Sequence, residues 1–427
     1  MIFELTDVQL FKQKALAWAA TFDTVCYLDS NNYTDPYGKF DTLISVGTKE
    51  EINPKSGTNF EKLANFRRQN PGFIAGFLGY DLKNEVENLS SDNADGLHFP
   101  DLYFFAPQIV ITINKNTVEI IAEDETGIFK QLESFEPSLQ DNIPSINIQS
   151  RFSKAEYIAV VEKIKAHIVR GDIYVTNFCQ EFYAENADIE PLYIFNKLNN
   201  LSPTPFSSFF KWKGNYIICA SPERFLAKRG SKLISQPIKG TARRDEDVAI
   251  DQNIKQELRS TPKELQENVM IVDLVRNDLT HSAKPGTVKT EELFGIQSFT
   301  QVHQMVSTVV CELRDDVSAV EAVKNTFPMG SMTGAPKISA MQLMEQYERS
   351  KRGVYSGAIG YFSPDDDFDF NVVIRTLLYN SEEKYLSFHA GGAITYHADP
   401  EREYEECLLK AKAILEVLDQ PPAYPPS

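Results

Sequence analysis

The stretch Lys-Leu-Ile-Ser-Gln-Pro-Ile-Lys-Gly-Thr, residues 232–241, places a strand-like run directly before a lysine that is flanked by turn residues. Residues 232–236 have the composition of a β-strand, and Pro237 is expected to end it. Gly240 leaves the backbone next to Lys239 open to the close approach of another group. One interpretation is a solvated loop lysine, because lysines are seldom buried. The other is that this segment presents the Lys239 amine to a small molecule.

The composition is that of a globular protein. The chain has 427 residues, of which 42% are hydrophobic and 24% are charged. That length suggests two or three domains, or one large two-part fold. The formal net charge of −17 argues against nucleic acid and anionic membrane as partners, since both attract clustered Lys and Arg. An anionic substrate would therefore need a local cation, either a metal ion or Arg and Lys side chains.

The cysteine pattern and the hydropathy of the chain indicate where in the cell the protein is located. The five cysteines are scattered, odd in number and without a Cys-x-x-Cys spacing, so we expect neither a disulfide framework nor a zinc site, but a reducing cytoplasm. The N-terminus lacks the pattern of a signal peptide, and no window approaches about 20 uninterrupted apolar residues. We therefore expect a cytoplasmic protein that does not span a membrane.

The chain divides into two regions. Residues 133–150 are polar, contain two prolines and lack helical periodicity, which predicts a boundary between residues 1–148 and 149–427. The first region is rich in short strand-like runs, such as 72–80 and 107–113. The second begins with a helix, because Ser153 and Glu156 have the spacing of a capping box and Gly171 closes an apolar stripe at helical spacing.

Two later helices, 263–275 and 402–418, each carry a Glu-x-x-Glu pair. The pairs are Glu264/Glu267 and Glu403/Glu406. Residues three apart share one helix face, so two opposed faces could hold a hard cation such as Mg²⁺ through oxygen ligands. The alternative is two solvated acidic faces. Lys410, four residues after Glu406, could form a surface ion pair or meet a substrate carboxylate.

Two further segments contain groups suited to binding an anion, and a third only resembles such a site. Residues 388–394 contain adjacent glycines, whose backbone N–H groups could converge on a carboxylate. Residues 330–337 superficially resemble a phosphate loop, but the spacing of the second glycine and the lysine does not match, so nucleotide binding is not expected. Arg375 lies in the apolar, strand-like run 372–376, which favours a bidentate contact with a carboxylate.

In this order, these segments resemble the chorismate-utilising enzyme family, which comprises anthranilate, aminodeoxychorismate, isochorismate and salicylate synthases. Residues 27–33 and 76–81 resemble the N-terminal part of the anthranilate and aminodeoxychorismate members. The remaining matches cover most of residues 150–420: 171–182, 221–225, 237–244, 264–279, 327–337, 354–362, 372–376, 390–394 and 401–414. The resemblance implies an α/β fold. Two large, mostly antiparallel β-sheets pack as a sandwich with outer helices, and the two regions are intertwined in one unit.

Two positions discriminate between branches of the family. Anthranilate synthases carry Ala where this chain has Lys239, and the form Pro-Ile-Lys-Gly-Thr is typical of aminodeoxychorismate synthase component I. That branch makes 4-amino-4-deoxychorismate for p-aminobenzoate and folate. Isochorismate and salicylate synthases carry a water-activating lysine where this chain has Val175, so the resemblance excludes them. The alternatives are anthranilate synthase component I and a non-catalytic tryptophan-binding or scaffold subunit.

The resemblance also implies roles for individual residues. One Mg²⁺ would bind the ring carboxylate of chorismate through Glu267 and Glu406, with Glu264 and Glu403 reaching its waters. Lys239 would attack the ring as a covalent nucleophile, and Glu223 would protonate the departing 4-hydroxyl. Contacts with the substrate are expected from Thr241, Gln304, Gly330, Ser331, Tyr355, Arg375, Gly391, Gly392, Ala393 and Lys410.

The remaining expectations concern partners and departures. No glutaminase sequence is present, so the resemblance implies a separate glutamine amidotransferase subunit that delivers ammonia. Gln304 stands where the family usually has His, and an amide cannot carry a proton. Ala393 replaces a usual Gly. Residues 28–30 align with a pocket that binds tryptophan in relatives.

Overall fold

The sheet branches at the long strand β5 (Leu102–Asn114), which pairs with β3 (Thr42–Ile52), β4 (Ile74–Leu78) and β6 (Thr117–Ile121). The strand β1 (Ile2–Glu4) extends the sheet beyond β6. These strands belong to a computed structural model that describes residues 1–54, 57–137, 146–299 and 302–419. Every pairing between the described strands is antiparallel, and the pairings join 20 strands into one hydrogen-bonded network.

Two arms leave β5. The β15 arm runs from β4 through five strands in order: β17 (Ala358–Phe362), β18 (Phe368–Asn371), β11 (Arg224–Arg229), β12 (Lys232–Gln236) and β15 (Val302–Glu312). The strands β13 (Ile238–Arg243) and β14 (Lys289–Ser298) also pair with β15. The β20 arm runs from β3 through β2 (Thr24–Asp29), β9 (Phe206–Trp212), β10 (Asn215–Ser221), β19 (Thr376–Asn380), β20 (Tyr385–Ile394) and β8 (Val175–Ala184). The short β7 (Gln149–Ser150) and β16 (Gly334–Ala335) pair with β8.

The two arms face each other. Phe77 of β4 lies four strands away from Phe210 of β9 along the sheet order, a separation of about 19 Å if the sheet were flat. Their ring centroids are nevertheless 5.5 Å apart. The sheet therefore folds over on itself, and one core cluster holds inner side chains of both arms. The α/β class with mostly antiparallel strands is confirmed, with the difference that the two expected sheets are continuous through β5.

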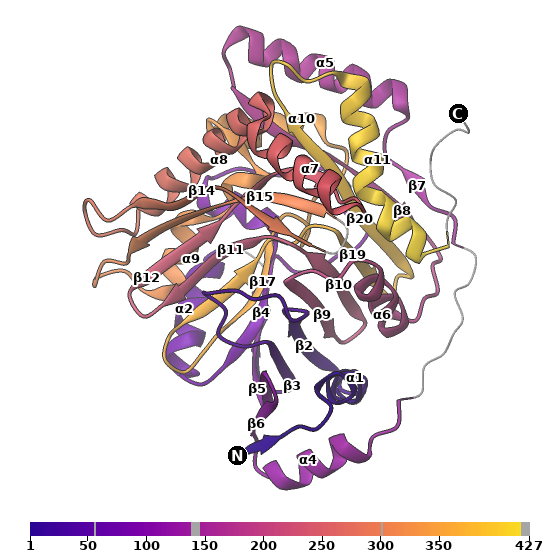
Figure 1. Cartoon of the computed structure of the whole chain (residues 1–427), viewed down its shortest axis with the longest axis vertical. Helices are drawn as coiled ribbons and strands as arrows, with labels where there is room; N and C mark the ends of the chain where they lie inside the picture. Colours follow the sequence, from indigo (N-terminus) through magenta and orange to yellow (C-terminus); the bar gives the residue numbers. More distant parts are fainter. Residues whose placement is uncertain (55–56, 138–145, 300–301, 420–427) are drawn as a thin grey trace.

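Helices cover the outside of the arms (Figure 1). α8 (Pro262–Thr280) packs on β15, and α11 (Pro400–Val417) packs on β20. A second core cluster lies beneath α1 (Val8–Ala19), α5 (Lys154–Arg170), α6 (Pro191–Leu201) and α11. The other helices are α2 (Asn59–Gln69), α3 (Lys83–Val86), α4 (Glu125–Ser134), α7 (Val248–Ser260), α9 (Ala319–Thr326) and α10 (Lys337–Tyr347), with the 3₁₀ turns η1 (Tyr80–Leu82) and η2 (Gly330–Met332).

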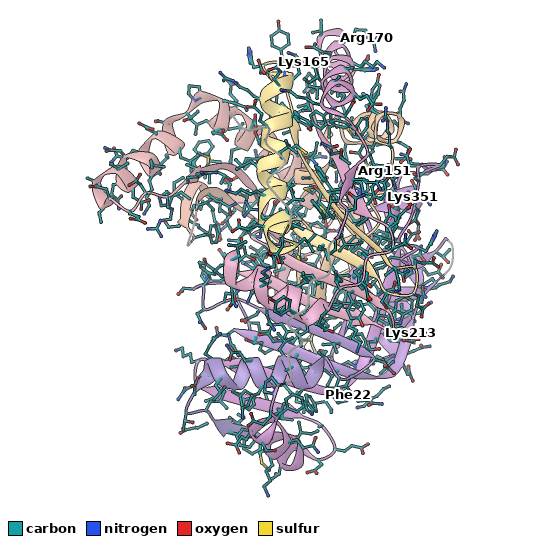
Figure 2. All side chains as sticks on the ribbon, turned by 90° about the vertical axis from the view of Figure 1, so that its right-hand side faces the viewer. Phe22, Arg151, Lys165, Arg170, Lys213 and Lys351 are labelled. Carbon is teal, nitrogen blue, oxygen red and sulfur yellow. The ribbon has the colours of Figure 1, made fainter. Side chains whose placement is uncertain are left out.

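The ends predicted for the helix after residue 150 are confirmed, whereas α8 extends five residues beyond the expected end at 275. The Ser153 side chain and Glu156 form a capping box at the start of α5, and Gly171 ends the helix with a φ of 86°. α8 and α11 cover the expected Glu-bearing segments. In Figure 2, Lys165 and Arg170 of α5 lie near one end of the molecule and Phe22 lies towards the other. Lys165 Nζ donates to the Ala398 carbonyl oxygen at 2.7 Å, which ties α5 to the loop before α11.

The strand expected over residues 232–236 is confirmed as β12, which ends directly before Pro237. The chain then resumes as β13 along the same edge of β15, so Lys239 lies in a strand rather than in a solvated loop. The strand expected at Arg375 was wrong. Arg375 occupies the connection between β18 and β19 with a φ of 51°, since the chain must turn there to pass from one arm to the other.

The predicted boundary at 133–150 lies partly outside the described residues, which omit 138–145. Pairings of β2 with β9 and of β4 with β17 join the regions on either side of it. All five cysteines are buried with free thiols. Among the described residues, no helix combines the length and the apolar composition needed to cross a bilayer.

Candidate active site

Lys239 lies at an irregular point of β13. The pairing of β13 with β15 shifts register between Ile238 and Thr241, and Gly240 has a φ of 94°. A Cβ atom on Gly240 would lie 3.0 Å from Glu264 Oε2 of α8, so the glycine allows this helix to approach the strand. The Lys239 side chain is partly buried, and its Nζ donates to the backbone oxygen of Ser331 in η2 at 3.4 Å.

Glu223 lies opposite this lysine, in the two-residue connection between β10 and β11. Its backbone N–H donates to Ser221 Oγ at 3.2 Å, and Ser221 Oγ donates to the Val372 carbonyl oxygen at 2.6 Å. The carboxylate accepts hydrogen bonds from the Ser331 side chain and the Ile238 backbone. Only 4% of the residue is exposed. Burial raises the pKa of Glu223 to about 7, so this carboxyl group can be protonated near neutral pH.

The pKa of Lys239 shifts in the opposite direction. Burial lowers the pKa of its amine, and the charge of Lys410 acts in the same sense. Glu223, Glu267 and Glu406 oppose that shift by favouring the ammonium form. A lowered lysine pKa beside a raised carboxyl pKa brings the two groups closer to their neutral forms, which is the arrangement expected of a nucleophile and an acid.

The two Glu-x-x-Glu pairs meet next to Lys239. Burial raises the pKa values of Glu264 and Glu267, and burial together with Glu406 raises the pKa of Glu403 to about 7. Glu406 is the exception, because Lys410 Nζ lies 2.7 Å from its Oε1 and lowers its pKa. Oxygen Oε1 of Glu267 is buried, and no described residue donates a hydrogen bond to it. The cluster is therefore short of positive charge.

Lys263, at the start of α8, is a member of this cluster that the sequence did not single out. Its Nζ lies 3.8 Å from Glu267 Oε1 and 3.8 Å from Glu403 Oε1, so it connects α8 to α11. The available signal was its spacing of four residues from Glu267, which matches the spacing of Glu406 and Lys410.

The fit of a metal ion can be tested on these side chains. In the described ranges, no three His, Cys, Asp or Glu side chains are gathered closely enough to hold a metal by themselves. The donor set still suits Mg²⁺ with waters, because all candidate ligands are carboxylates and Glu267 Oε1 accepts no hydrogen bond from the described residues. A cation would also reverse the raised pKa values of Glu264, Glu267 and Glu403.

Strand β20 brings backbone groups to the same place. Lys410 Nζ donates to the Gly391 carbonyl oxygen at 2.8 Å. Within an antiparallel ladder the N–H and C=O of one residue point to the same side, so the N–H groups of Gly391 and Ala393 face Lys410 while that of Gly392 faces β8. β19 pairs only with residues 385–388 of β20, which leaves this edge open. A Cβ on Gly391 would lie 2.0 Å from the Phe178 carbonyl oxygen, so close strand contact requires the glycine.

The other expected substrate contacts are placed less closely. The partly buried Arg375 is near enough to Glu223 for that carboxylate to favour its charged form. Gly330 begins η2, and a Cβ on it would lie 2.9 Å from Leu274 of α8.

Gln304 of β15 pairs with the exposed Thr241 of β13. The Gln304 side chain is buried, and no described residue donates a hydrogen bond to its Oε1. Tyr355 is buried and stacks on His389, with centroids 4.9 Å apart, rather than on the glutamate cluster.

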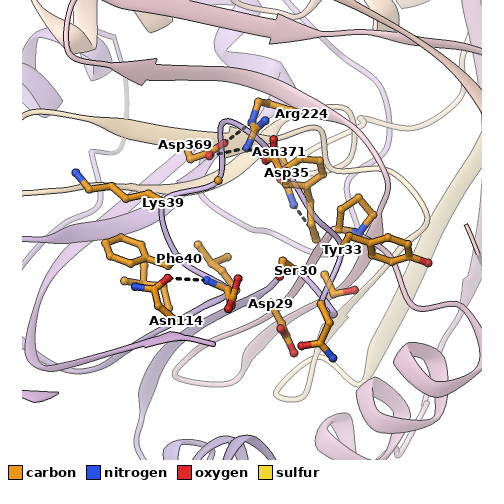
Figure 3. A pocket seen from close by; sticks show the side chains of 18 of the residues that line it. Asp29, Ser30, Tyr33, Asp35, Lys39, Phe40, Asn114, Arg224, Asp369 and Asn371 are labelled. Atoms are coloured by element: carbon orange, nitrogen blue, oxygen red, sulfur yellow. Dashed lines mark hydrogen bonds and ion pairs between the residues drawn. The ribbon is translucent and has the colours of Figure 1, made fainter. Parts of the chain in front are cut away.

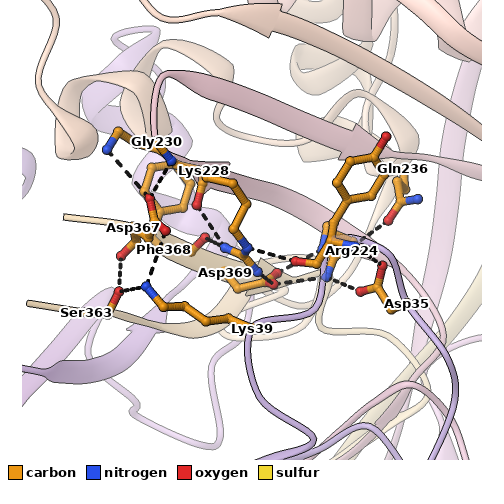
Figure 4. Close-up of polar contacts among 12 residues, drawn as sticks. Asp35, Lys39, Arg224, Lys228, Gly230, Gln236, Ser363, Asp367, Phe368 and Asp369 are labelled. Carbon is orange, nitrogen blue, oxygen red and sulfur yellow. Dashed lines mark hydrogen bonds and ion pairs between the residues drawn. The ribbon is translucent and has the colours of Figure 1, made fainter. Parts of the chain in front are cut away.

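A separate cavity of about 460 Å³ lies beside the segment 28–30 (Figure 3). The Asp29 carboxylate accepts hydrogen bonds from Lys12 Nζ at 2.9 Å and from the Tyr27 hydroxyl at 2.9 Å. The neighbouring Ser30 Oγ is buried and forms no hydrogen bond with a described residue. The adjoining loop is fixed by an ion pair of Asp35 with Arg224, which also binds Asp369 (Figure 4). None of Lys239, Ser331 and the four glutamates lines this cavity.

Comparison with known proteins gives two kinds of relative. The chain matches the family model of chorismate binding enzymes over residues 18–416. Aminodeoxychorismate synthase component 1 of Bacillus subtilis (strain 168) is 31% identical over 366 residues, which cover 82% of this chain and 77% of the relative. Anthranilate synthase component 1 of Cereibacter sphaeroides is 33% identical over 364 residues, which cover 80% and 72% of the two chains.

Solved structures agree on the fold. The crystal structure of anthranilate synthase component I from Streptococcus pneumoniae TIGR4 has a TM-score of 0.78 at 24% identity and covers 90% of this chain and 93% of that chain. The menaquinone-specific isochorismate synthase from Escherichia coli has a TM-score of 0.78 at 17% identity, with 98% and 93% covered. These identities establish the shared fold alone. The family model spans nearly the whole sequence, and the protein therefore belongs to the family of chorismate binding enzymes.

Proposed function

We propose that this protein is component I of an aminodeoxychorismate synthase, which converts chorismate and ammonia to 4-amino-4-deoxychorismate. The observation that carries this proposal is the Lys239 amine with its lowered pKa beside Glu223. A relative at 31% identity has the corresponding name, but a relative at 33% is named anthranilate synthase, so overall identity does not choose between the two activities. The chemistry of residue 239 favours the first.

The proposed substrate is a dianion, and the site offers local positive charge within a chain of net charge −17. Lys410 and the N–H groups of Gly391 and Ala393 would hold the ring carboxylate, and Arg375 would hold the enolpyruvyl carboxylate. Tyr355, Thr241, Gln304, Gly330 and Ser331 would complete the binding surface. Gln304 can donate or accept a hydrogen bond there but cannot shuttle a proton.

We further propose Mg²⁺ as the cofactor. Glu267 and Glu406 would bind it directly, while Glu264 and Glu403 would bind its waters. When bound, it would supply positive charge to the ring carboxylate and favour departure of the 4-hydroxyl.

The proposed reaction has two displacements. The neutral Lys239 amine attacks ring carbon 2 while the bond from carbon 4 to its hydroxyl breaks, and Glu223 protonates the departing oxygen to give water. The new carbon–nitrogen linkage then gives its extra proton to the Glu223 carboxylate, which restores the acid. Ammonia adds at carbon 4 and the bond from carbon 2 to Lys239 breaks, while the Lys239 nitrogen takes up the extra proton of the added ammonia, so that the neutral lysine amine and the product amine remain. The product keeps its enolpyruvyl group, because no step cleaves it.

The ammonia would come from a glutamine amidotransferase subunit, consistent with the designation component 1 in the relatives. We place the reaction in the cytoplasm and in p-aminobenzoate and folate biosynthesis. Without its partner, the chain should use free ammonia.

Product identity tests the proposal. The purified chain is incubated with chorismate, Mg²⁺ and excess ammonium at alkaline pH. The products are separated by HPLC and identified by mass spectrometry. The expected product retains the enolpyruvyl group and yields p-aminobenzoate when a lyase is added. Formation of anthranilate with immediate pyruvate release would show that the chain is instead an anthranilate synthase component.

A further inference from the structure

We propose that Lys263 is a displaceable internal counter-ion, which holds the glutamates of α8 and α11 together until a divalent cation takes its place. This inference rests on the proposed function, because the cation is the one assigned to that site. It concerns a residue with no role in the proposed chemistry, and it predicts that the chain tunes its own affinity for metal.

The position of Lys263 is the first observation. Its Nζ lies at the same distance, 3.8 Å, from a carboxylate oxygen on each helix, Glu267 Oε1 and Glu403 Oε1. Of the ion pairs among the described residues, this is the one that joins α8 to α11. Glu267 Oε1 is also buried, and within the described part of the chain no group donates a hydrogen bond to it. The ammonium is therefore an electrostatic partner at a distance too long for a hydrogen bond.

The contrast with the other two lysines is the second observation. Lys410 is fixed, because its Nζ lies 2.7 Å from Glu406 Oε1 and donates to the Gly391 carbonyl oxygen at 2.8 Å. Lys239 is partly buried and donates to the Ser331 carbonyl oxygen. Lys263 is 47% exposed and lies on the first turn of its helix, so its flexible side chain can swing into water at little cost.

Charge balance gives the direction of the effect. When ionised, the four glutamates carry four negative charges, against three positive charges on Lys239, Lys263 and Lys410. A divalent cation bound to Glu267 would be repelled by an ammonium held near the same oxygen. Lys263 must leave as the cation binds, and the energy of its two ion pairs is subtracted from the metal affinity. Without metal, the same pairs lessen the repulsion between the two helices.

The experiment measures Mg²⁺ binding by isothermal titration calorimetry on the full chain, without substrate. The variants are Lys263→Gln, Lys263→Arg and, as a matched control, Lys412→Gln, which removes an exposed charge from α11. We expect Lys263→Gln to bind Mg²⁺ about tenfold more tightly than the wild type, and the other two variants to bind like the wild type. Thermal unfolding should show a lower midpoint for Lys263→Gln without metal and a larger rise when Mg²⁺ is added.

The possible results separate the two proposals. Equal or weaker Mg²⁺ binding by Lys263→Gln would overturn the counter-ion role and leave the proposed reaction untouched. If Mg²⁺ binds to Lys263→Gln but not to the wild type, and the double variant Lys263→Gln/Glu267→Gln does not bind it, the counter-ion role is supported and Lys263 excludes the metal completely. If neither wild type nor Lys263→Gln binds Mg²⁺, both the counter-ion role and the proposed cofactor are wrong, while product identity still tests the amination independently.

Discussion

At the scale of single residues, a partly buried lysine and a buried glutamate lie next to each other in a protein with a net charge of −17. Removing an amine or a carboxyl group from water lowers the stability of the fold when the group is charged. Lys239 and Glu223 are held there by hydrogen bonds to the backbone of Ser331 and from the backbone of Ile238. A pair arranged in this way is suited to proton and covalent chemistry rather than to stability.

Replacing Lys239 by Ala should lower kcat/KM for amination by at least about 10³-fold, because the proposed covalent step is lost. Rates with chorismate and ammonium chloride measure this, and Lys232→Ala provides a control on the preceding strand. Thermal unfolding should be unchanged or slightly improved, since a partly buried amine is removed. Full amination by Lys239→Ala would refute the nucleophile role.

Replacing Glu223 by Gln should make stability less dependent on pH. The folded-state pKa is raised from 4.5 to about 7, so the group is protonated in both states below pH 4.5, and the folded state bears the whole burial cost above pH 7. Wild-type stability should thus fall by at most about 3 kcal/mol relative to the variant as pH rises through this window. Urea unfolding at pH 4.5 and pH 8.5 tests this. A constant difference between the two proteins would contradict it.

Residue type and flanking residues predict Lys239 and the four glutamates as site candidates, because proline, glycine and helical spacing are local signals. Lys263 escapes such prediction, since its partner Glu403 is 140 positions away and the meeting of the two helices depends on how both arms of the sheet fold. The strand assignment of Arg375 fails for a related reason. Its apolar neighbours resemble a strand, while the connection between β18 and β19 requires a turn.

At the scale of elements, β20 and α11 together form one side of the site. Gly391 permits the close contact of β20 with β8 and exposes its carbonyl oxygen to Lys410 of α11. The helix α5 is predicted well because capping residues mark its ends, and the Glu-bearing faces of α8 and α11 follow from regular spacing. The end of α8 is not predicted: the helix runs to Thr280, beyond the expected residue 275, and its N-cap Thr261 makes no side-chain hydrogen bond. The strand β13 is not predicted either, because the sequence after Pro237 gives no local sign that the chain continues along β15.

Substitution of Gly391 by Ala should destabilise the protein by roughly 2–4 kcal/mol, because the added methyl group would collide with backbone atoms of β8. Amination should also fall, since the edge of β20 would move away from Lys410. Gly72→Ala is the control, as no atom lies within 4 Å of its added Cβ. Urea unfolding compares the two. Equal stability of Gly391→Ala and wild type would show that the strands can separate without cost.

At the scale of the whole molecule, Arg224 links the two arms. It is 1% exposed and binds Asp369 of the β15 arm at 2.9 Å, while its guanidinium also pairs with Asp35 and lies 4.9 Å from the Phe206 ring of the β20 arm. Arg224→Gln should cost about 2–4 kcal/mol, because Asp35 loses its charged partner and the buried Asp369 keeps only Arg229. Lys213→Gln removes an exposed ion pair and should cost less than about 1 kcal/mol. Similar unfolding midpoints for the two variants would contradict this role.

The fold class follows from the resemblance of ordered sequence segments, but the branching at β5 does not. Which strands become neighbours depends on contacts between segments that are far apart in the chain, such as Phe77 with Phe210. No local periodicity encodes these contacts. The expectation of two packed, mostly antiparallel sheets is thus confirmed, whereas their connection through β5 could not be predicted from the sequence.

That continuity affects how the protein is made on the ribosome. Leu78 at the end of β4 pairs with Ala358 of β17, which is 280 positions further along the chain. At a translation rate of about 5–20 residues per second, β4 waits roughly 15–60 s for its partner to be synthesised. During this interval an apolar strand has one unpaired edge, which is a hazard for aggregation. The nascent chain should therefore be a client of chaperones until its last third has emerged.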